Sequence, residues 1–207
     1  MITVLGWLLG IANGIRHALE PDHVAAISTL VAEERSAKRT AAFAAMWGLG
    51  HGSMLLVVGG TLIGLRTRMP VRMEQAFELV VALMLVLLGG RAIRAAVALA
   101  RGESFVAKSP MRRPLLIGIM HGLAGSGALT ALVASQMPSA LAGIVTLILY
   151  GLGATLGMVL LARVASAGLE TVAKSRRGIP AVLGLTGAAS LILGALFGVQ
   201  AAIALAA

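Results

Sequence analysis

Long apolar stretches alternate with short polar links along the whole chain. A helix needs roughly 20 predominantly apolar residues to cross a bilayer. Six stretches approach or exceed this length, at residues 2–19 with an extension to 32, 41–65, 77–100, 115–137, 140–165 and 179–206. The pattern predicts an all-α integral membrane protein with six transmembrane helices, folded as a single membrane domain over residues 1–207.

The composition agrees with this class, and the charges set an orientation. The chain is 58% hydrophobic and 12% charged, whereas a soluble domain carries about 25% charged residues. The net charge is +9, and 13 of the 17 basic residues lie around the links after the first, third and fifth spans. This distribution indicates the positive-inside rule rather than nucleic acid binding. We expect a multi-pass protein of the cell membrane, in a bacterial inner membrane, with both termini outside the cytoplasm.

Two short segments recur at nearly the same offset. The segment GIRHAL at 14–19 returns as GIMHGL at 118–123, and WGLG at 47–50 returns as YGLG at 150–153. Each half, about 1–103 and 104–207, would hold three spans. Because three is odd, the second half would cross the membrane in the opposite sense. The sequence thus predicts two inverted three-helix repeats, the plan of many secondary transporters.

Three metal-capable side chains, His17, Asp22 and His23, interrupt the first apolar stretch. Ionisable groups inside a membrane segment are costly and are usually functional. On an unbroken helix the two histidines would point about 120° apart, since each residue turns about 100°. Pro21, however, starts helices well and disfavours the helical conformation at Glu20. We therefore predict one helix that ends just before Glu20 and a second that starts at Pro21, which lets the three side chains converge.

The second half has an interruption at the matching place. The segment GLAGSG at 122–127 begins directly after His121, which is the repeat mate of His17. The first span of each half is therefore expected to be broken. Ser126 and Gly127 stand where the first half has its Asp-His pair, so we treat His121 and Ser126 as pathway or supporting residues. A role for His121 as a ligand stays open.

The expected ligands offer imidazole and carboxylate donors, which suit nickel, cobalt, zinc or copper better than magnesium or calcium. His51 joins the set because the glycines around it permit close helix packing toward the first span. The predicted metal ligands are His17, Asp22, His23 and His51. Arg16 and Glu20 are expected beside them as supporting or pathway groups. In an alternative arrangement, Glu20 and Asp22 would pair with Arg16 in a water-exposed cap at the membrane edge.

The run RHALEPDH at 16–23, with its His-x4-Asp-His spacing and the following VAAI, resembles the signature of the nickel/cobalt transporter family. LGH at 49–51 resembles the second motif of that family, and GLAGSG at 122–127 resembles its short six-span branch of urease-associated nickel permeases. The resemblance implies transport of Ni²⁺ or Co²⁺, with the four predicted ligands in the metal path.

The chain departs from the family pattern in several places. Glu20 stands where Asp is usual, and Gly-Ser-Gly at 125–127 replaces the acidic third motif of longer members. The two extra spans of those members and a His-rich loop are not found. These departures leave the metal and the direction of transport open.

The leading interpretation is a permease for a divalent transition metal, Ni²⁺ and/or Co²⁺, which is carried as substrate and not held as a cofactor. The alternative is a secondary transporter of another small solute, such as an amino acid or an inorganic anion bound at Arg16. No enzyme is expected, because a serine hydrolase built on Ser126 would need a base and no His follows His121. The expected partners are the lipid bilayer and the metal ion, without nucleic acid; a homo-oligomer stays open.

Overall fold

The computed structural model describes residues 2–34, 36–103, 110–125, 129, 133, 137–173, 175 and 177–206. The regular elements in this part of the chain are helices, which confirms the predicted all-α class. They are α1 (Ile2–His17), α2 (Pro21–Glu33), α3 (Ala37–Gly64), α4 (Val71–Ala100), α5 (Arg112–Ala124), α7 (Ala140–Val172) and α8 (Gly178–Ala206). Of these, α3, α4, α7 and α8 are long and apolar enough to cross a membrane.

The four long helices correspond to the second, third, fifth and sixth predicted spans. The first predicted span is divided into α1, with 16 residues, and α2, with 13 residues. At 1.5 Å per residue, each is shorter than the bilayer core of about 30 Å. The fourth predicted span begins with α5, which ends at Ala124 with Gly125 as its C-cap. Most of the remainder of that span, including Ser126 and Gly127, lies outside the described residues.

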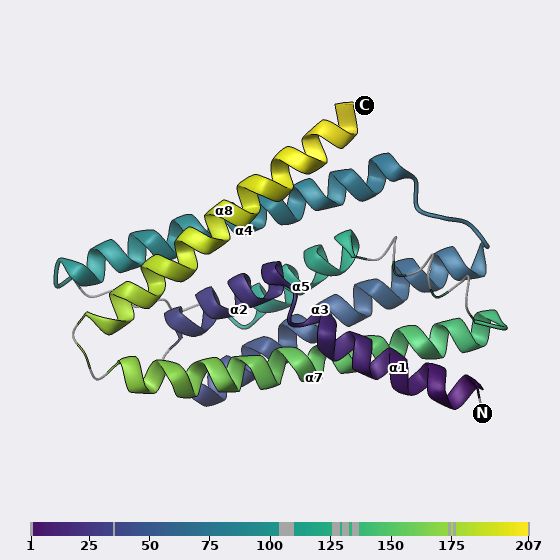
Figure 1. Ribbon diagram of the computed structural model, residues 1–207, viewed down its shortest axis with the longest axis horizontal. Coiled ribbons are helices and arrows are strands. Elements are labelled where there is room, and N and C mark those ends of the chain that lie inside the picture. Colours follow the sequence, from purple (N-terminus) through teal and green to yellow (C-terminus); the bar gives the residue numbers. More distant parts are fainter. Residues whose placement is uncertain are drawn as a thin grey trace.

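The break between α1 and α2 confirms the local prediction. α1 ends at His17, and the amide of Glu20 donates to the carbonyl of His17 at 3.0 Å in a tight turn. Glu20 is the N-cap of α2 in an extended conformation, with ψ 148°, and Pro21 opens the helix. Proline is well suited to this position because the first helical residue needs no N–H donor. The chain consequently changes direction between the two helices (Figure 1).

Two groups of helices build the molecule. In the first, α3 packs against α7 and α5, and α1 packs against α7. In the second, α4 and α8 pack along each other, and Figure 1 shows this pair as a separate layer. α2 lies between the groups, in contact with α7 on one side and with α4 and α8 on the other. The main core cluster joins them through buried side chains that include Trp47, Leu85 and Met158.

The contacts of α5 with α3 and of α1 with α7 bring backbones close together. A Cβ atom on Gly118 would overlap the carbonyl oxygen of Trp47, and one on Gly50 would overlap that of Leu115. Only glycine permits such an approach, because any side chain at these positions would separate the helices. The α3–α5 contact therefore holds the middle of α3 against the first turns of α5.

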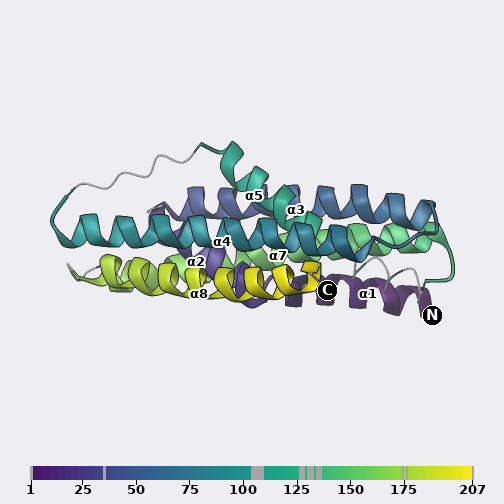
Figure 2. The same ribbon diagram turned by 90° about the horizontal axis from the view of Figure 1, so that it is seen from above.

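The long helices run roughly along the long axis of the molecule, so their ends gather at its two opposite ends. Both termini lie in the same half of this axis, as Figures 1 and 2 show. α3 ends and α4 and α7 begin at the end nearest the N-terminus (Figure 1). α4 and α7 end, and α8 begins, at the opposite end (Figure 2).

Candidate metal centre

The four histidines of the chain converge at the break between α1 and α2. His17 is the last residue of α1, His23 lies in the first turn of α2, His51 lies in α3 and His121 lies in α5. The ring centroid of His23 is 4.4 Å from that of His17, 5.4 Å from that of His51 and 4.2 Å from that of His121. With Asp22 beside His23, the structure brings the predicted ligands together and places His121 next to them.

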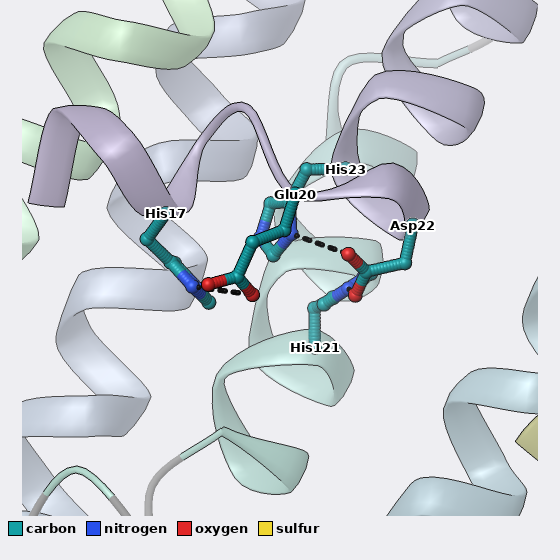
Figure 3. Close-up of polar contacts among 5 residues, drawn as sticks. All are labelled: His17, Glu20, Asp22, His23 and His121. Atoms are coloured by element: carbon teal, nitrogen blue, oxygen red, sulfur yellow. Dashed lines mark hydrogen bonds and ion pairs between the residues drawn. The ribbon is translucent and has the colours of Figure 1, made fainter.

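Asp22 connects two of the histidines, as Figure 3 shows. The Nδ1 atom of His23 lies 3.2 Å from Oδ1 of Asp22, and the Nε2 atom of His121 lies 2.7 Å from Oδ2. A carboxylate accepts from both rings, so these hydrogen bonds place the imidazole protons on the sides that face Asp22. The opposite nitrogens, Nε2 of His23 and Nδ1 of His121, are then free to act as lone-pair donors.

Glu20 acts in the same way on the remaining histidine of the break. Its Oε2 atom accepts from Nδ1 of His17 at 2.9 Å, and its side chain is 48% exposed (Figure 3). A carboxylate in this position fixes the orientation of an imidazole and raises its basicity as a ligand. The acids therefore contact histidines, rather than pairing with Arg16 in the alternative cap. Arg16 itself is exposed at the end of α1.

Several ring nitrogens in the cluster are buried and have no hydrogen-bond partner within the part of the chain that the structure describes. They are Nε2 of His17, Nε2 of His23, both ring nitrogens of His51 and Nδ1 of His121. A buried polar group without a partner costs about 1–3 kcal/mol. Neutral imidazole nitrogens gathered in this way offer the donors that a late transition metal takes. The cluster thus has the donor set of a metal site.

Two groups of three donors lie close enough to hold an ion among the described residues. The ligand atoms of His17, His23 and His51 lie within 4.8 Å of one another, and so do those of Asp22, His23 and His121. Modest side-chain adjustment would close either set around an ion, since imidazole nitrogens bind metals at roughly 2 Å.

A cavity of about 360 Å³ leads to this cluster from the side of α4 and α8. Its polar lining includes three carboxylates, Glu20, Asp22 and Glu78, which favour a cation over an anion. His17, His23 and His121 also line it, whereas His51 is fully buried and is not part of the lining. An ion in the cavity would meet these three histidines before it could reach His51.

Sequence reasoning missed Glu78 and two aromatic residues. Glu78 lies in the third predicted span, where an acidic residue is itself a signal of function. The ring of Trp47 stacks on His23 with centroids 5.7 Å apart, and Tyr150 lies 5.5 Å from His17. Trp47 and Tyr150 occupy equivalent positions of the repeated WGLG and YGLG segments. This repetition of an aromatic residue was the feature of the sequence from which their place beside the histidines could have been predicted.

Comparison with known proteins gives three relatives along much of the chain. The urease accessory protein UreH of Bacillus sp. (strain TB-90) is 31% identical over 201 residues, which cover 90% of this chain and 87% of UreH. The chloroplast proteins FOR GROWTH AND FERTILITY 1 and 2 of Arabidopsis thaliana are each 31% identical, over 74% and 72% of this chain. The chain spans 48% and 44% of these two plant proteins. No family model matches the chain, and no solved structure matches it.

Proposed function

We propose, because the chain belongs to the family of the urease accessory protein UreH, that it transports a divalent transition metal, Ni²⁺ and/or Co²⁺, across a membrane. One observation carries this proposal: four histidines and Asp22 meet beside an acid-lined cavity, with buried ring nitrogens that lack hydrogen-bond partners among the described residues. The ligand set is His17, Asp22, His23 and His51, with His121 and Glu20 in direct contact with its members. The metal is the cargo and not a cofactor.

The two halves of the chain, 1–103 and 104–207, are proposed to be inverted repeats. The close contact of Gly118 in α5 with the Trp47 carbonyl in α3 has a counterpart in the other half. There, a Cβ on Gly14 in α1 would overlap the carbonyl oxygen of Tyr150 in α7. Gly14 and Gly118 are repeat mates, and so are Trp47 and Tyr150. Equivalent residues that make equivalent contacts support a pseudo-two-fold relation between the halves.

In this arrangement α1 and α2 form one broken span, and the chain crosses the membrane six times. The first span of each half packs against the second span of the other half, α1 on α7 and α5 on α3. Such a scaffold moves its cargo by rocking one half against the other around a central site. Asp22 would offset the charge of the ion as its hydration shell is exchanged for imidazole nitrogens. A bacterial inner membrane and termini outside the cytoplasm remain part of the proposal.

The alternative cargo, an amino acid or an inorganic anion, gains no support. The carboxylates of Glu20, Asp22 and Glu78 line the cavity and would repel an anion. Arg16, the residue proposed to bind one, is exposed and does not line the cavity. The relative of matching length is named an accessory protein and not an enzyme, which supports the expectation that this chain catalyses no reaction.

Calorimetric titration of the purified full-length protein with NiCl₂, CoCl₂ and MgCl₂ tests the proposal. We expect binding of Ni²⁺ or Co²⁺, no binding of Mg²⁺, and loss of binding in His23→Ala. Proteoliposomes that contain the same protein should accumulate radioactive nickel, and His23→Ala proteoliposomes should not. Wild-type protein that binds neither Ni²⁺ nor Co²⁺ would rule out metal transport.

A further inference from the structure

His23 lies between two groups of donors. Its ring centroid is 4.2 Å from that of His121 on one side, and 5.4 Å from that of His51 on the other. The rings of His51 and His121 are 6.4 Å apart. The two sets of three ligand atoms, one with Asp22 and His121 and the other with His17 and His51, have His23 as their common member.

The two ring nitrogens of His23 differ in their surroundings. Nδ1 lies 3.2 Å from Asp22, whereas Nε2 is buried without a hydrogen-bond partner among the described residues. Each set takes one ligand atom from His23. The set with Asp22 and His121 offers two imidazoles and a carboxylate, and the set with His17 and His51 offers three imidazoles.

The two sets also differ in their access to the cavity. Asp22, His23 and His121 all line it, so an ion there can reach them directly, whereas the other set meets the cavity only through His17 and His23. His51 is fully buried, and both of its nitrogens lack partners in the described part of the chain. The helix that carries it packs closely on α5, because a Cβ on Gly122 would lie 2.5 Å from the carbonyl oxygen of His51. The set with His51 is therefore the inner one.

We propose that the metal occupies two overlapping positions that share His23: an outer position on Asp22, His23 and His121, and an inner position on His17, His23 and His51. This inference rests on the proposed transport function and divides it into two steps. Because the two positions share His23 and lie close together, repulsion between divalent cations limits a chain to one ion at a time. Transfer through a shared ligand moves the ion inward without returning it to water, and two moderate positions release an ion more readily than one tight site.

The test is calorimetric titration of purified full-length protein with Co²⁺, using His121→Ala, His51→Ala, the double variant and His23→Ala. Each single variant keeps one position, so its affinity should fall only about twofold to fivefold, as expected when one of two similar states is removed. The double variant and His23→Ala lose both positions, and their affinity should fall more than about a hundredfold. Glu34→Gln is the matched control, because Glu34 pairs with Arg39 away from the cluster.

The visible spectrum of bound Co²⁺ gives a second readout, since the two positions differ in their donor atoms. The wild-type spectrum should equal a weighted sum of the His51→Ala spectrum, which represents the outer position, and the His121→Ala spectrum, which represents the inner one. Where an alanine variant does not purify as a folded protein, His51→Gln or His121→Asn replaces it.

The possible results separate this inference from the function on which it rests. If wild-type protein binds one Co²⁺ and each single variant loses more than about thirtyfold in affinity, all the ligands belong to one centre, and the two-position inference is overturned. Two ions per wild-type chain would also overturn it, because repulsion between divalent cations at positions this close excludes double occupancy. If wild-type protein binds no metal, the transport proposal itself fails.

Discussion

At the scale of single residues, Glu20 and Asp22 differ in what they contribute to the cluster. Asp22 contacts both His23 and His121, whereas Glu20 contacts His17 alone and has a half-exposed side chain. Glu20 is thus suited to orient His17 from outside the ligand set. Removing such an outer partner typically lowers metal affinity by about 10- to 100-fold.

We predict that Glu20→Ala lowers the affinity for Ni²⁺ about tenfold, and that Glu20→Gln has a smaller effect because its amide oxygen still accepts from Nδ1 of His17. Calorimetric titration measures both variants. Glu34→Gln serves as the control, since Glu34 pairs with Arg39 elsewhere. Unchanged affinity in Glu20→Ala would mean that packing alone orients His17.

Glu78 lines the cavity from α4, opposite the histidines. Its charge should attract the ion into the cavity without binding it in the cluster. Glu78 should therefore affect how readily the ion enters the cavity more than how fast the ion is carried across the membrane. We predict that Glu78→Gln raises the KM of nickel uptake about threefold and leaves the maximal rate unchanged, an effect that weakens at high salt. Initial uptake rates in proteoliposomes at two ionic strengths measure this. Glu74→Gln, one turn earlier on α4 and outside the cavity lining, should change KM less.

The meeting of His17, Asp22 and His23 was predictable from the sequence because it depends on a local break in the helix. His17, Asp22 and His23 lie within seven residues, and Pro21 between them determines how the backbone turns. The contact of His121 with Asp22 joins residues 99 positions apart and depends on how α5 packs against α3 and α4. No local pattern contains that information, so the sequence left the role of His121 open.

At the scale of helices, the α3–α5 contact determines where His51 and His121 lie. A Cβ on Gly50 would overlap the carbonyl oxygen of Leu115, whereas a Cβ on Gly60 in the same helix meets nothing within 4 Å. We predict that Gly50→Ala destabilises the protein by about 1–3 kcal/mol, the usual cost of overpacking. The matched variant Gly60→Ala should be neutral or stabilising, since alanine is the better helix former.

Thermal unfolding in detergent, followed by circular dichroism, compares the two glycine variants. Gly50→Ala should also weaken Ni²⁺ binding, because the displaced α5 carries His121 away from Asp22. A Gly50→Ala protein that unfolds at the wild-type temperature and binds Ni²⁺ normally would show that the two helices are not held at this contact.

At the scale of the whole molecule, the sequence indicated two related halves but not how they combine. Its repeat predicts that equivalent helices exist in each half. The structure pairs α1 with α7 and α5 with α3, so the first helix of each half packs on a helix of the other. Elements that follow each other in the chain usually lie side by side. The sequence pattern does not indicate that the first helix of each half packs instead on the other half. The histidine cluster consequently combines side chains of the first half with His121 of the second, so its assembly needs both halves to be folded.

The six crossings can be tested directly because the chain contains no cysteine. Thr67 and Pro138 are exposed at the junctions α3–α4 and α5–α7, whereas Glu103 and Ser175 are exposed beyond the ends of α4 and α7. We predict that a membrane-impermeant maleimide labels Thr67→Cys and Pro138→Cys in intact cells. Glu103→Cys and Ser175→Cys should react only after permeabilisation, since the basic links belong in the cytoplasm.

The pattern of labelling separates topology from orientation. If the two pairs exchange sides, the crossings between residues 67 and 175 stand and only the positive-inside assignment is wrong. If Thr67→Cys and Ser175→Cys react together in intact cells, α4, α5 and α7 do not alternate across the membrane as inverted repeats require. The second half would then not be an inverted copy of the first, and rocking of two inverted halves could not carry an ion across the membrane.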